Sequence, residues 1–354
     1  MQPDGKLVAV GWTTFRAQTY FAVARFNSDG SLDPSFDGDG KLVTAFNSSS
    51  DVARAVAVQA DGKILVAGST ERISPAPFFA SNYDFAVARY NSDGSLDTSF
   101  DGDGKLTVDF TSSQDSAYGL ALQPDGKILV AGERSGDFLV ARYNNNGTPD
   151  ASFGSQDIFD GLGYVRTDFG FSDSLPNVVA RAITLQPDGK IVVVGDGFPV
   201  DNFFAVARYN SNGSRDDSFD GDGRLSGFFG LNLNQANAVV LQPDGKLVIA
   251  GRVGGDFALA RFNDNGSPDT SFDGDGLQTT DFGASSDVAY GVALQASGKI
   301  VVAGFRQVGL NTNFALARYL PNGSLDSSWG TGGKSTVNFS GDDTAYALVI
   351  QPDS

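Results

Sequence analysis

One unit of about sixty residues recurs six times along the 354 residues of the chain. Its clearest marker is the turn Gln-Pro-Asp-Gly-Lys. The third position of this turn is Asp4, Asp61, Asp125, Asp188 and Asp244 in the first five copies and Ser297 in the sixth. The first three residues of the turn appear once more at Gln351-Pro352-Asp353. Because a short repeat can bury its apolar face only against neighbouring copies, one continuous repeat architecture is favoured over separate domains. The end of the chain starts the unit that the beginning completes, which predicts an array that closes on itself.

Each copy contains four short stretches with the spacing of β-strands. In the second copy these are residues 52–59, 63–68, 85–90 and 105–110. Ile64 and Val66 show the period of two expected for a sheet, and turns rich in Asp and Gly separate the stretches. No window of a dozen residues carries a convincing helical stripe. The sequence therefore predicts an all-β, six-bladed β-propeller with four antiparallel strands in each blade.

The phase of the repeat predicts how this propeller closes. Residues 6–11, 20–26 and 41–46 supply three strands of the first blade, and residues 345–351 return as its missing strand. We therefore expect a single domain over residues 1–354, with the N- and C-terminal strands in one blade. The chain begins in mid-turn without the charged and apolar regions of a signal peptide, so we expect it to be excised from a longer protein.

Composition narrows the available chemistry. The chain has no Cys and no His, which removes disulfides, thiolate nucleophiles, imidazole bases and the usual zinc ligands. Its formal charge of −17 argues against nucleic acid as a partner. No apolar run approaches the roughly 20 residues that cross a bilayer, so membrane insertion is not expected. Carboxylates, Tyr, Arg, Lys and hydroxyl groups remain as functional groups.

Three elements recur in fixed order: Phe-Ala-Val-Ala-Arg-Tyr-Asn, Ser-Asp-Gly-Ser-Leu-Asp and Gln-Pro-Asp-Gly-Lys. With them the chain resembles the bacterial delta-60 repeat family over essentially its whole length. The resemblance implies β-propeller blades and a setting in large exported or surface-attached proteins, with no common activity, so we expect an extracellular or cell-surface location. The chain departs from the family pattern where most copies read Asp-Gly-Asp-Gly; only residues 330–333 keep the neutral Gly-Thr-Gly-Gly.

One Arg and one Asp recur in every copy at constant spacing. The pairs are Arg25 and Asp33, Arg89 and Asp97, Arg142 and Asp150, Arg208 and Asp216, Arg261 and Asp269, and Arg318 and Asp326. Because the planar guanidinium suits a carboxylate, we expect one structural ion pair in each blade. The alternative is an arginine cluster for an anion, but repetition around a ring would point these side chains away from a common centre.

The Asp-Gly-Asp-Gly turns offer a candidate calcium site. Alternating Asp and Gly can present several oxygens to one Ca²⁺, because Asp supplies hard ligands and Gly permits a tight backbone. The candidate ligands are Asp37, Asp39, Asp101, Asp103, Asp220, Asp222, Asp273 and Asp275. The distal Glu of a calcium loop is missing, and the sixth copy lacks these acids. Solvated turn acids are therefore the alternative, and no other cofactor is expected.

The copies differ most in the loops between their second and third strands. Aromatic and Arg side chains outside the repeat gather near these loops, among them Trp12, Arg72, Phe79, Arg134 and Arg306. Such a combination suits a pocket for a polar or sugar ligand. A second set occupies matched positions near the start of the first strand: Arg54, Tyr118, Arg181, Asn237, Tyr290 and Tyr346. If these strands line an axial channel, the side chains contact a ligand at its mouth or plug it by bonding to one another.

Two classes of function remain open. The first is a non-catalytic binding, adhesion or scaffold module of an exported bacterial protein, which holds a glycan, peptide or protein on the variable loops. The second is a carbohydrate-active enzyme, a glycosidase or lyase, with Glu71, Glu133 and Tyr118 as the catalytic candidates, since glycoside cleavage can use two carboxylates or a Tyr with an acid. We expect the two Glu at the same strand end in adjacent copies. As a catalytic pair they would lie about 5 to 10 Å apart.

Overall fold

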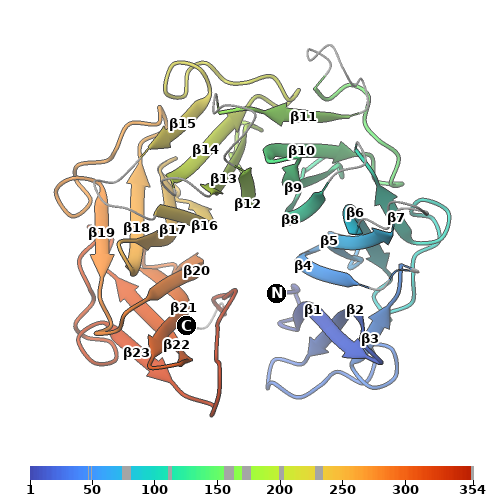
Figure 1. Ribbon diagram of the computed structural model, residues 1–354, viewed down its shortest axis with the longest axis horizontal. Coiled ribbons are helices and arrows are strands. Elements are labelled where there is room, and N and C mark those ends of the chain that lie inside the picture. Colours follow the sequence, from blue (N-terminus) through green and yellow to red (C-terminus); the bar gives the residue numbers. More distant parts are fainter. Residues whose placement is uncertain are drawn as a thin grey trace. The chain divides into compact units, whose positions relative to one another are not determined.

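The computed structural model describes residues 1–46, 48, 50–73, 81–110, 114–154, 163–169, 177–198, 203–227 and 234–351. All regular elements within these ranges are β-strands (Figure 1). No helix in this part of the chain is long and apolar enough to cross a membrane. The strands fall into two compact units, residues Met1–Asp168 and Phe169–Ser354, which we describe one at a time.

The first unit contains three antiparallel sheets. The first sheet consists of β1 (Leu7–Phe15), β2 (Gln18–Phe26) and β3 (Lys41–Thr44). The second consists of β4 (Asp51–Val58), β5 (Ile64–Ile73), β6 (Ser81–Tyr90) and β7 (Lys105–Val108). The third consists of β8 (Asp115–Leu122), β9 (Ile128–Arg134), β10 (Asp137–Tyr143) and β11 (Tyr164–Thr167). Each strand pairs with its neighbours in the sequence, so every sheet is a simple meander.

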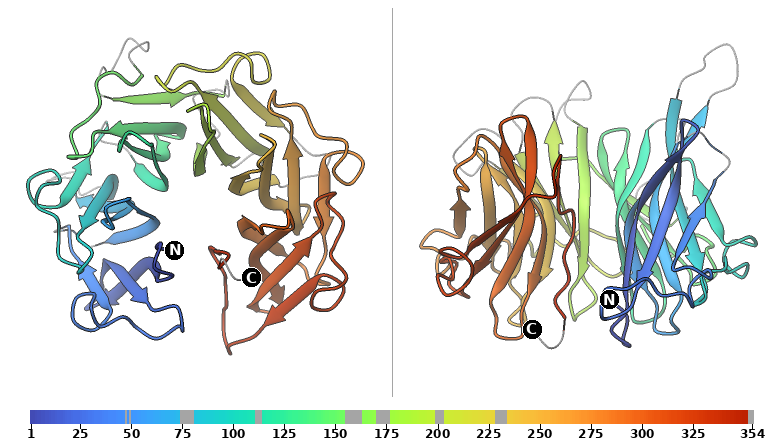
Figure 2. Two further views of the ribbon diagram at one scale, coloured as in Figure 1. Left: turned by 180° about the vertical axis from the view of Figure 1, so that it is seen from behind. Right: turned by 90° about the horizontal axis from the view of Figure 1, so that it is seen from below.

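The second unit repeats this plan with three four-stranded sheets. The first consists of β12 (Asn177–Leu185), β13 (Ile191–Phe198), β14 (Phe203–Tyr209) and β15 (Arg224–Gly227). The second consists of β16 (Asn234–Leu241), β17 (Leu247–Val253), β18 (Asp256–Phe262) and β19 (Leu277–Thr280). The third consists of β20 (Asp287–Leu294), β21 (Ile300–Val308), β22 (Asn311–Tyr319) and β23 (Lys334–Val337). In each unit the turns between strands lie at the two ends of the sheets (Figure 2). The predicted fold class, an all-β six-bladed β-propeller, is confirmed. The single domain depends on how the units sit together and stays a prediction.

The closure of the first blade by the C-terminal segment stays a prediction, because it joins elements of the two units. The sheet of the first blade has three strands, and residues 345–351, expected as the fourth, belong to no strand. The C-terminal segment instead packs on the last blade, where the Asp343 N–H donates to the carbonyl of Thr312 at 2.8 Å. Asp287 makes the matching bond to Gly255 at 2.5 Å. The segment is therefore docked on the last blade as a first strand would be, but it has no second strand to pair with inside its own unit.

The predicted ion pair is present in every blade and is confirmed as a structural element. The Nε–Oδ2 distances are 2.6 to 2.8 Å for Arg25–Asp33, Arg89–Asp97, Arg142–Asp150, Arg208–Asp216, Arg261–Asp269 and Arg318–Asp326. In the first blade Lys6 lies 2.9 Å from the same carboxylate. The Arg25 guanidinium covers the ring of the buried Phe36 at 4.7 Å and donates to the carbonyl of Ser92 in the second blade at 2.5 Å. The corresponding Arg of the other blades also covers an aromatic ring, which is buried in each except the last, where Trp329 is half-buried. Arg25 therefore links a buried ring, a carboxylate and the neighbouring blade.

Candidate functional site

The four-stranded blades all break their strand register at the same place. Pairing between the first and second strands skips one residue in each, namely Arg54, Tyr118, Arg181, Asn237 and Tyr290. A β-bulge of this kind leaves one residue outside the ladder and redirects its side chain, and bulges are frequent beside functional sites. These are five of the six matched positions that the sequence predicted to contact a ligand. The sixth, Tyr346, lies in the docked C-terminal segment.

The bulge accounts for a glycine that recurs in the second strand. A Cβ on Gly68 would lie 2.0 Å from the carbonyl oxygen of Val52. The same position meets a first-strand carbonyl oxygen at 1.8 to 2.0 Å at Gly132, Gly251 and Gly304. No side chain fits there, so only glycine allows the two strands to pair around the bulge. Gly11 has no atom within 4 Å of that point, as expected for a sheet that lacks a first strand.

The residue after this glycine differs from blade to blade. It is Trp12, Ser69, Glu133, Asp196, Arg252 or Phe305. In three blades it contacts the bulged residue of its own sheet. Tyr118 donates its hydroxyl to Glu133 Oε1 at 3.2 Å, the Arg181 Nε lies 2.6 Å from Asp196 Oδ1, and the ring centres of Tyr290 and Phe305 are 6.0 Å apart. Each blade therefore presents its own pair of variable side chains at one fixed place. The second residue of each pair directly follows the repeated glycine. This matched position is a sequence signal that was not used to predict it.

Bulged residues of successive blades also contact one another. In the first unit β4 adjoins β8, and the Arg54 guanidinium lies 4.8 Å from the ring centre of Tyr118. Arg54 is exposed and Tyr118 is half-buried. Arg54, Tyr118 and Glu133 form a continuous chain of cation, aromatic ring and carboxylate, which we call the Arg54 cluster.

In the second unit the corresponding group is built around Tyr290. Its ring centre is 5.0 Å from that of Tyr346, which is 64% exposed. The Asn237 side-chain amide donates to the carbonyl of Ala289, next to Tyr290, at 2.9 Å. Burial raises the pKa of the Tyr290 phenol, and the positive charge of Arg181 opposes this shift. We call Arg181, Asn237, Tyr290 and Tyr346 the Tyr290 cluster.

The other predicted ligand contacts lie in different surroundings. Trp12 is 54% exposed on β1. Arg134 is buried, donates to the Tyr164 hydroxyl at 2.8 Å and covers that ring at 5.4 Å. Arg72 forms ion pairs described below, and Arg306 is half-buried on β21. Phe79 lies outside the described residues.

The two Glu residues lie near the same end of the second strands β5 and β9 in successive sheets, as expected, but not at paired positions. Glu133 pairs across from Phe138 as Ser69 pairs across from Phe85, whereas Glu71 lies two residues further along β5. The offset arises because the β5–β6 hairpin is longer than the β9–β10 hairpin. Glu71 instead lines a groove of about 850 Å³ between the first and second blades, together with Tyr20, Arg72 and Asp84 among others. Catalysis by any of the candidates stays a prediction.

The Asp-Gly-Asp-Gly turns use their acids as turn formers. The first Asp of each turn has a left-handed backbone with φ of 49 to 51° at Asp37, Asp101, Asp220 and Asp273. The second accepts the N–H two residues further on, over 2.8 to 2.9 Å, at Asp39, Asp103, Asp222 and Asp275. Both roles are those of Asp in tight turns. Calcium binding at these eight acids stays a prediction.

A family model described as "Domain of unknown function (DUF5122) beta-propeller" matches six segments, residues 2–36, 59–100, 123–153, 186–219, 242–272 and 295–328. Together they make up more than half of the chain. Each segment runs from about the end of a first strand to the loop after the third strand. The matched unit thus includes the repeated ion pair and the second-strand glycine but leaves out the bulged residues. Among curated proteins, none matches the sequence.

Several solved structures share the fold at low sequence identity. A protein of unknown function from Dyadobacter fermentans is 13% identical with a TM-score of 0.53, over 89% of this chain and 91% of that one. An ulvan lyase, described as a new family of polysaccharide lyase, is 11% identical with a TM-score of 0.54, over 92% and 80%. Virginiamycin B lyase from Staphylococcus aureus is 11% identical with a TM-score of 0.50, over 95% and 89%. At these identities the similarity establishes the fold alone.

Proposed function

Because the chain belongs to the DUF5122 β-propeller family, in which the repeat maintains the blades, we propose that it is a non-catalytic binding module for a glycan. The observation that carries this proposal is the placement of the most variable side chains at five β-bulges of one kind. A scaffold that needed only to fold would not require Arg, Tyr and Asn at positions surrounded by Ala, Val and Leu. The bulge places each of them outside the ladder, where it is available to a ligand.

The side chains in the two clusters suit sugars. Tyr346 presents an exposed ring in contact with Tyr290, and an aromatic face can pack against the apolar face of a pyranose. Arg54 and the Asn237 amide supply donors, while Glu133 supplies an acceptor. The exposed guanidinium of Arg54 favours an acidic sugar, because it can pair with a carboxylate or sulfate. Peptide or protein partners remain alternatives that a binding screen distinguishes.

The setting of this module follows from its resemblance to the delta-60 repeat. That resemblance supports an exported or surface-attached bacterial protein, with the ligand outside the cell. Antibodies raised against the chain would then label intact cells of the source organism. Labelling only after the cells are permeabilised would refute this location.

A carbohydrate-active enzyme is the second candidate, and one observation favours it. The Tyr118 hydroxyl is hydrogen-bonded to Glu133 beside Arg54. A phenol next to a carboxylate can exchange a proton, and an adjacent Arg can hold an acidic sugar. As an enzyme the chain would cleave an acidic polysaccharide, and Tyr118→Phe would abolish turnover. As a binding module it would release no new reducing or unsaturated ends from any polysaccharide.

A glycan array tests the proposal. The wild-type chain should bind a restricted set of glycans, and Arg54→Ala and Tyr118→Ala should weaken that binding. Lys41→Ala is the matched control, because Lys41 is exposed and pairs only with its turn neighbour Asp39 at 3.4 Å among the described residues. Binding that survives both cluster variants would place the site elsewhere, and no binding to any glycan would refute this ligand class.

A further inference from the structure

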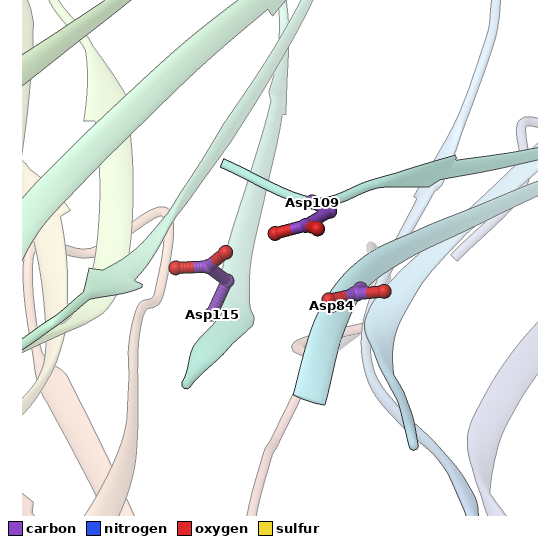
Figure 3. A group of neighbouring side chains, drawn as sticks. All are labelled: Asp84, Asp109 and Asp115. Atoms are coloured by element: carbon purple, nitrogen blue, oxygen red, sulfur yellow. The ribbon is translucent and has the colours of Figure 1, made fainter. Parts of the chain in front are cut away.

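Two groups of three aspartates lie at matching places in the two units. They are Asp84, Asp109 and Asp115 in the first unit (Figure 3), and Asp256, Asp281 and Asp287 in the second. In each group one carboxylate oxygen from each residue lies within 4.8 Å of the other two. In each group one acid precedes the repeated Phe of a third strand, one directly follows a fourth strand, and one begins the next blade's first strand. In the described ranges no other site gathers three acids in this way.

The blade fold does not require three acids at this place. At the junction of the first and second blades the matching residues are Tyr20, Ala45 and Asp51. There Asp51 stands alone, and its Oδ1 accepts hydrogen bonds from the hydroxyls of Ser48 at 2.5 Å and Thr70 at 2.6 Å. A single acid whose carboxylate accepts hydrogen bonds from hydroxyl groups is thus sufficient to form this blade junction. The extra acids at two junctions need another explanation.

The two groups leave buried carboxylate oxygens without a hydrogen-bond partner. Asp115 and Asp287 are both 0% exposed. In each, Oδ2 accepts a backbone N–H, from Phe110 at 2.9 Å and from Phe282 at 2.8 Å. Their Oδ1 atoms accept no hydrogen bond in the described structure, and neither does the Oδ1 of Asp84. A buried carboxylate oxygen without a partner is strongly unfavourable, and a cation would supply that partner.

The two groups differ in their countercharge. In the first, Arg72 Nε lies 3.1 Å from Asp84 and its terminal nitrogen lies 2.9 Å from Asp109. In the second, no Lys or Arg of the described chain lies within 4.0 Å of the carboxylates of Asp256, Asp281 or Asp287. Burial raises the pKa of Asp287, and the negative charges of Asp256 and Asp281 act in the same direction, whereas the N–H of Phe282 and the positive charge of Arg306, outside ion-pair distance, oppose the shift. The second group is therefore the one whose charge is not balanced by a direct ion pair.

We propose that Asp256, Asp281 and Asp287 bind a divalent cation, Ca²⁺, at the junction of the fifth and sixth blades. Carboxylate oxygens are the ligands that Ca²⁺ prefers, and Ca–O distances of about 2.3 to 2.6 Å place ligands around one ion no more than about 5 Å apart. The oxygens of this group meet that limit. Mg²⁺ requires a tighter, near-ideal octahedron, and the chain has no His or Cys for softer metals. Water completes the coordination sphere.

Asp84, Asp109 and Asp115 form a weaker version of the same site, because Arg72 competes with the ion for two of its carboxylates. This proposal does not depend on the glycan ligand. The two are nevertheless neighbours in the fold, because Asp287 lies three residues before the bulged Tyr290 on β20. A cation there would hold the start of the strand that carries Tyr290.

Calorimetric titration of the chelator-treated full chain with CaCl₂ tests the proposal. We expect one site with a dissociation constant below ~1 mM, the weak end for extracellular calcium modules. Asp281→Asn should weaken it at least ~10-fold, the loss expected for removing one charged ligand. Asp281 is exposed, and Asn keeps an acceptor for the Gly283 N–H, so this variant should fold. Asp275→Asn, in the nearby Asp-Gly-Asp-Gly turn, is the matched control and should bind as the wild type does.

Three results would overturn the site: no binding heat up to ~10 mM Ca²⁺, well beyond the range of protein calcium sites; unchanged affinity in Asp281→Asn; or a loss in Asp275→Asn as large as that in Asp281→Asn. Arg72→Ala tests the competition separately. It should create a second binding event in the titration, and a titration curve that still fits one site would refute the role given to Arg72.

Discussion

The guanidinium of Arg54 lies 4.8 Å from the ring centre of Tyr118, although the two residues belong to different blades. Each is the residue that the strand register skips at a bulge in its own first strand. Because β4 and β8 adjoin, the repeated bulge brings variable residues of successive blades together. The β-bulge that recurs in the blades thus creates a surface shared by successive blades. Substitution of the bulged residue in each blade changes the chemistry of that surface.

Removing the Tyr118 hydroxyl distinguishes binding from catalysis. Tyr118→Phe keeps the ring beside Arg54 and removes the hydroxyl that donates to Glu133. For a binding module we expect a loss of about 1 kcal/mol in glycan affinity, typical of one hydrogen bond. For an enzyme that uses this phenol, turnover would fall by ~100-fold or more. Parallel measurements of affinity and of polysaccharide cleavage separate the two outcomes.

The second-strand glycine should be indispensable only where a first strand is present. Gly251→Ala places a Cβ 1.8 Å from the carbonyl oxygen of Gln235, so we expect the free energy of unfolding to fall by about 2 to 4 kcal/mol. Gly11→Ala is the matched control, since nothing lies within 4 Å there, and it should change stability by less than about 1 kcal/mol. Denaturant unfolding measures both. Equal losses in the two variants would contradict the three-stranded first sheet.

The repeated ion pairs predict acid sensitivity. Burial alone would raise the pKa of Asp97, but hydrogen bonds from Lys63 and Ser99 and the charge of Arg89 outweigh it and hold that pKa well below its ordinary value. A carboxylate whose pKa is lower in the folded state stabilises the fold above the unfolded pKa of about 3.9 and loses this contribution as the pH falls below it. The free energy of unfolding should therefore decrease steeply between about pH 5 and pH 2.

Asp97→Asn isolates one of these pairs at neutral pH. The substitution leaves the buried Arg89 without its anionic partner, and removal of one member of a buried pair costs about 3 to 5 kcal/mol. Asp61→Asn is the control, because Asp61 is exposed and lies 4.0 Å from Lys63; its effect should stay within about 0.5 kcal/mol. Similar stability losses in both variants would show that the pair is not structural.

Calcium should stabilise the chain if the proposed cation site is correct. A ligand that binds only the folded state raises the unfolding free energy by about 2.7 kcal/mol at one hundred times its dissociation constant. Thermal unfolding with CaCl₂ and with chelator measures this shift. The shift should persist in Asp39→Asn, whose acid belongs to an Asp-Gly-Asp-Gly turn, and disappear in Asp287→Asn. A shift that depends on Asp39 would instead support calcium binding in the turns.

The sequence was sufficient for features that repeat and insufficient for features that depend on blade packing. Spacing predicted the strands and the Arg25–Asp33 type of ion pair, because every copy provides an independent example of the same pattern. The bulged residues were recognised as large polar residues in an apolar strand. The bulge itself was not, since the clash that excludes a Cβ from Gly68 appears only when two strands are paired.

The acidic groups escaped prediction for a related reason. Asp256, Asp281 and Asp287 come from three segments of two blades, and none of the segments carries a metal-binding motif. Asp287 lies three residues before the bulged Tyr290 in the sequence, but only the fold directs its carboxyl group to Asp256 and Asp281. The pairing of residues 345–351 with the first blade stays a prediction, because the repeat indicates which strand a segment resembles but not whether it is paired.

The affinity of the Tyr290→Ala variant for an array-selected glycan, measured by calorimetry beside the wild type and Lys41→Ala, tests the account most directly. Loss of the ring that contacts Tyr346 should weaken binding at least ~10-fold, about 1.4 kcal/mol, while Lys41→Ala binds as the wild type does. Unchanged affinity in Tyr290→Ala, or an equal loss in Lys41→Ala, would contradict the claim that the bulged positions hold the ligand.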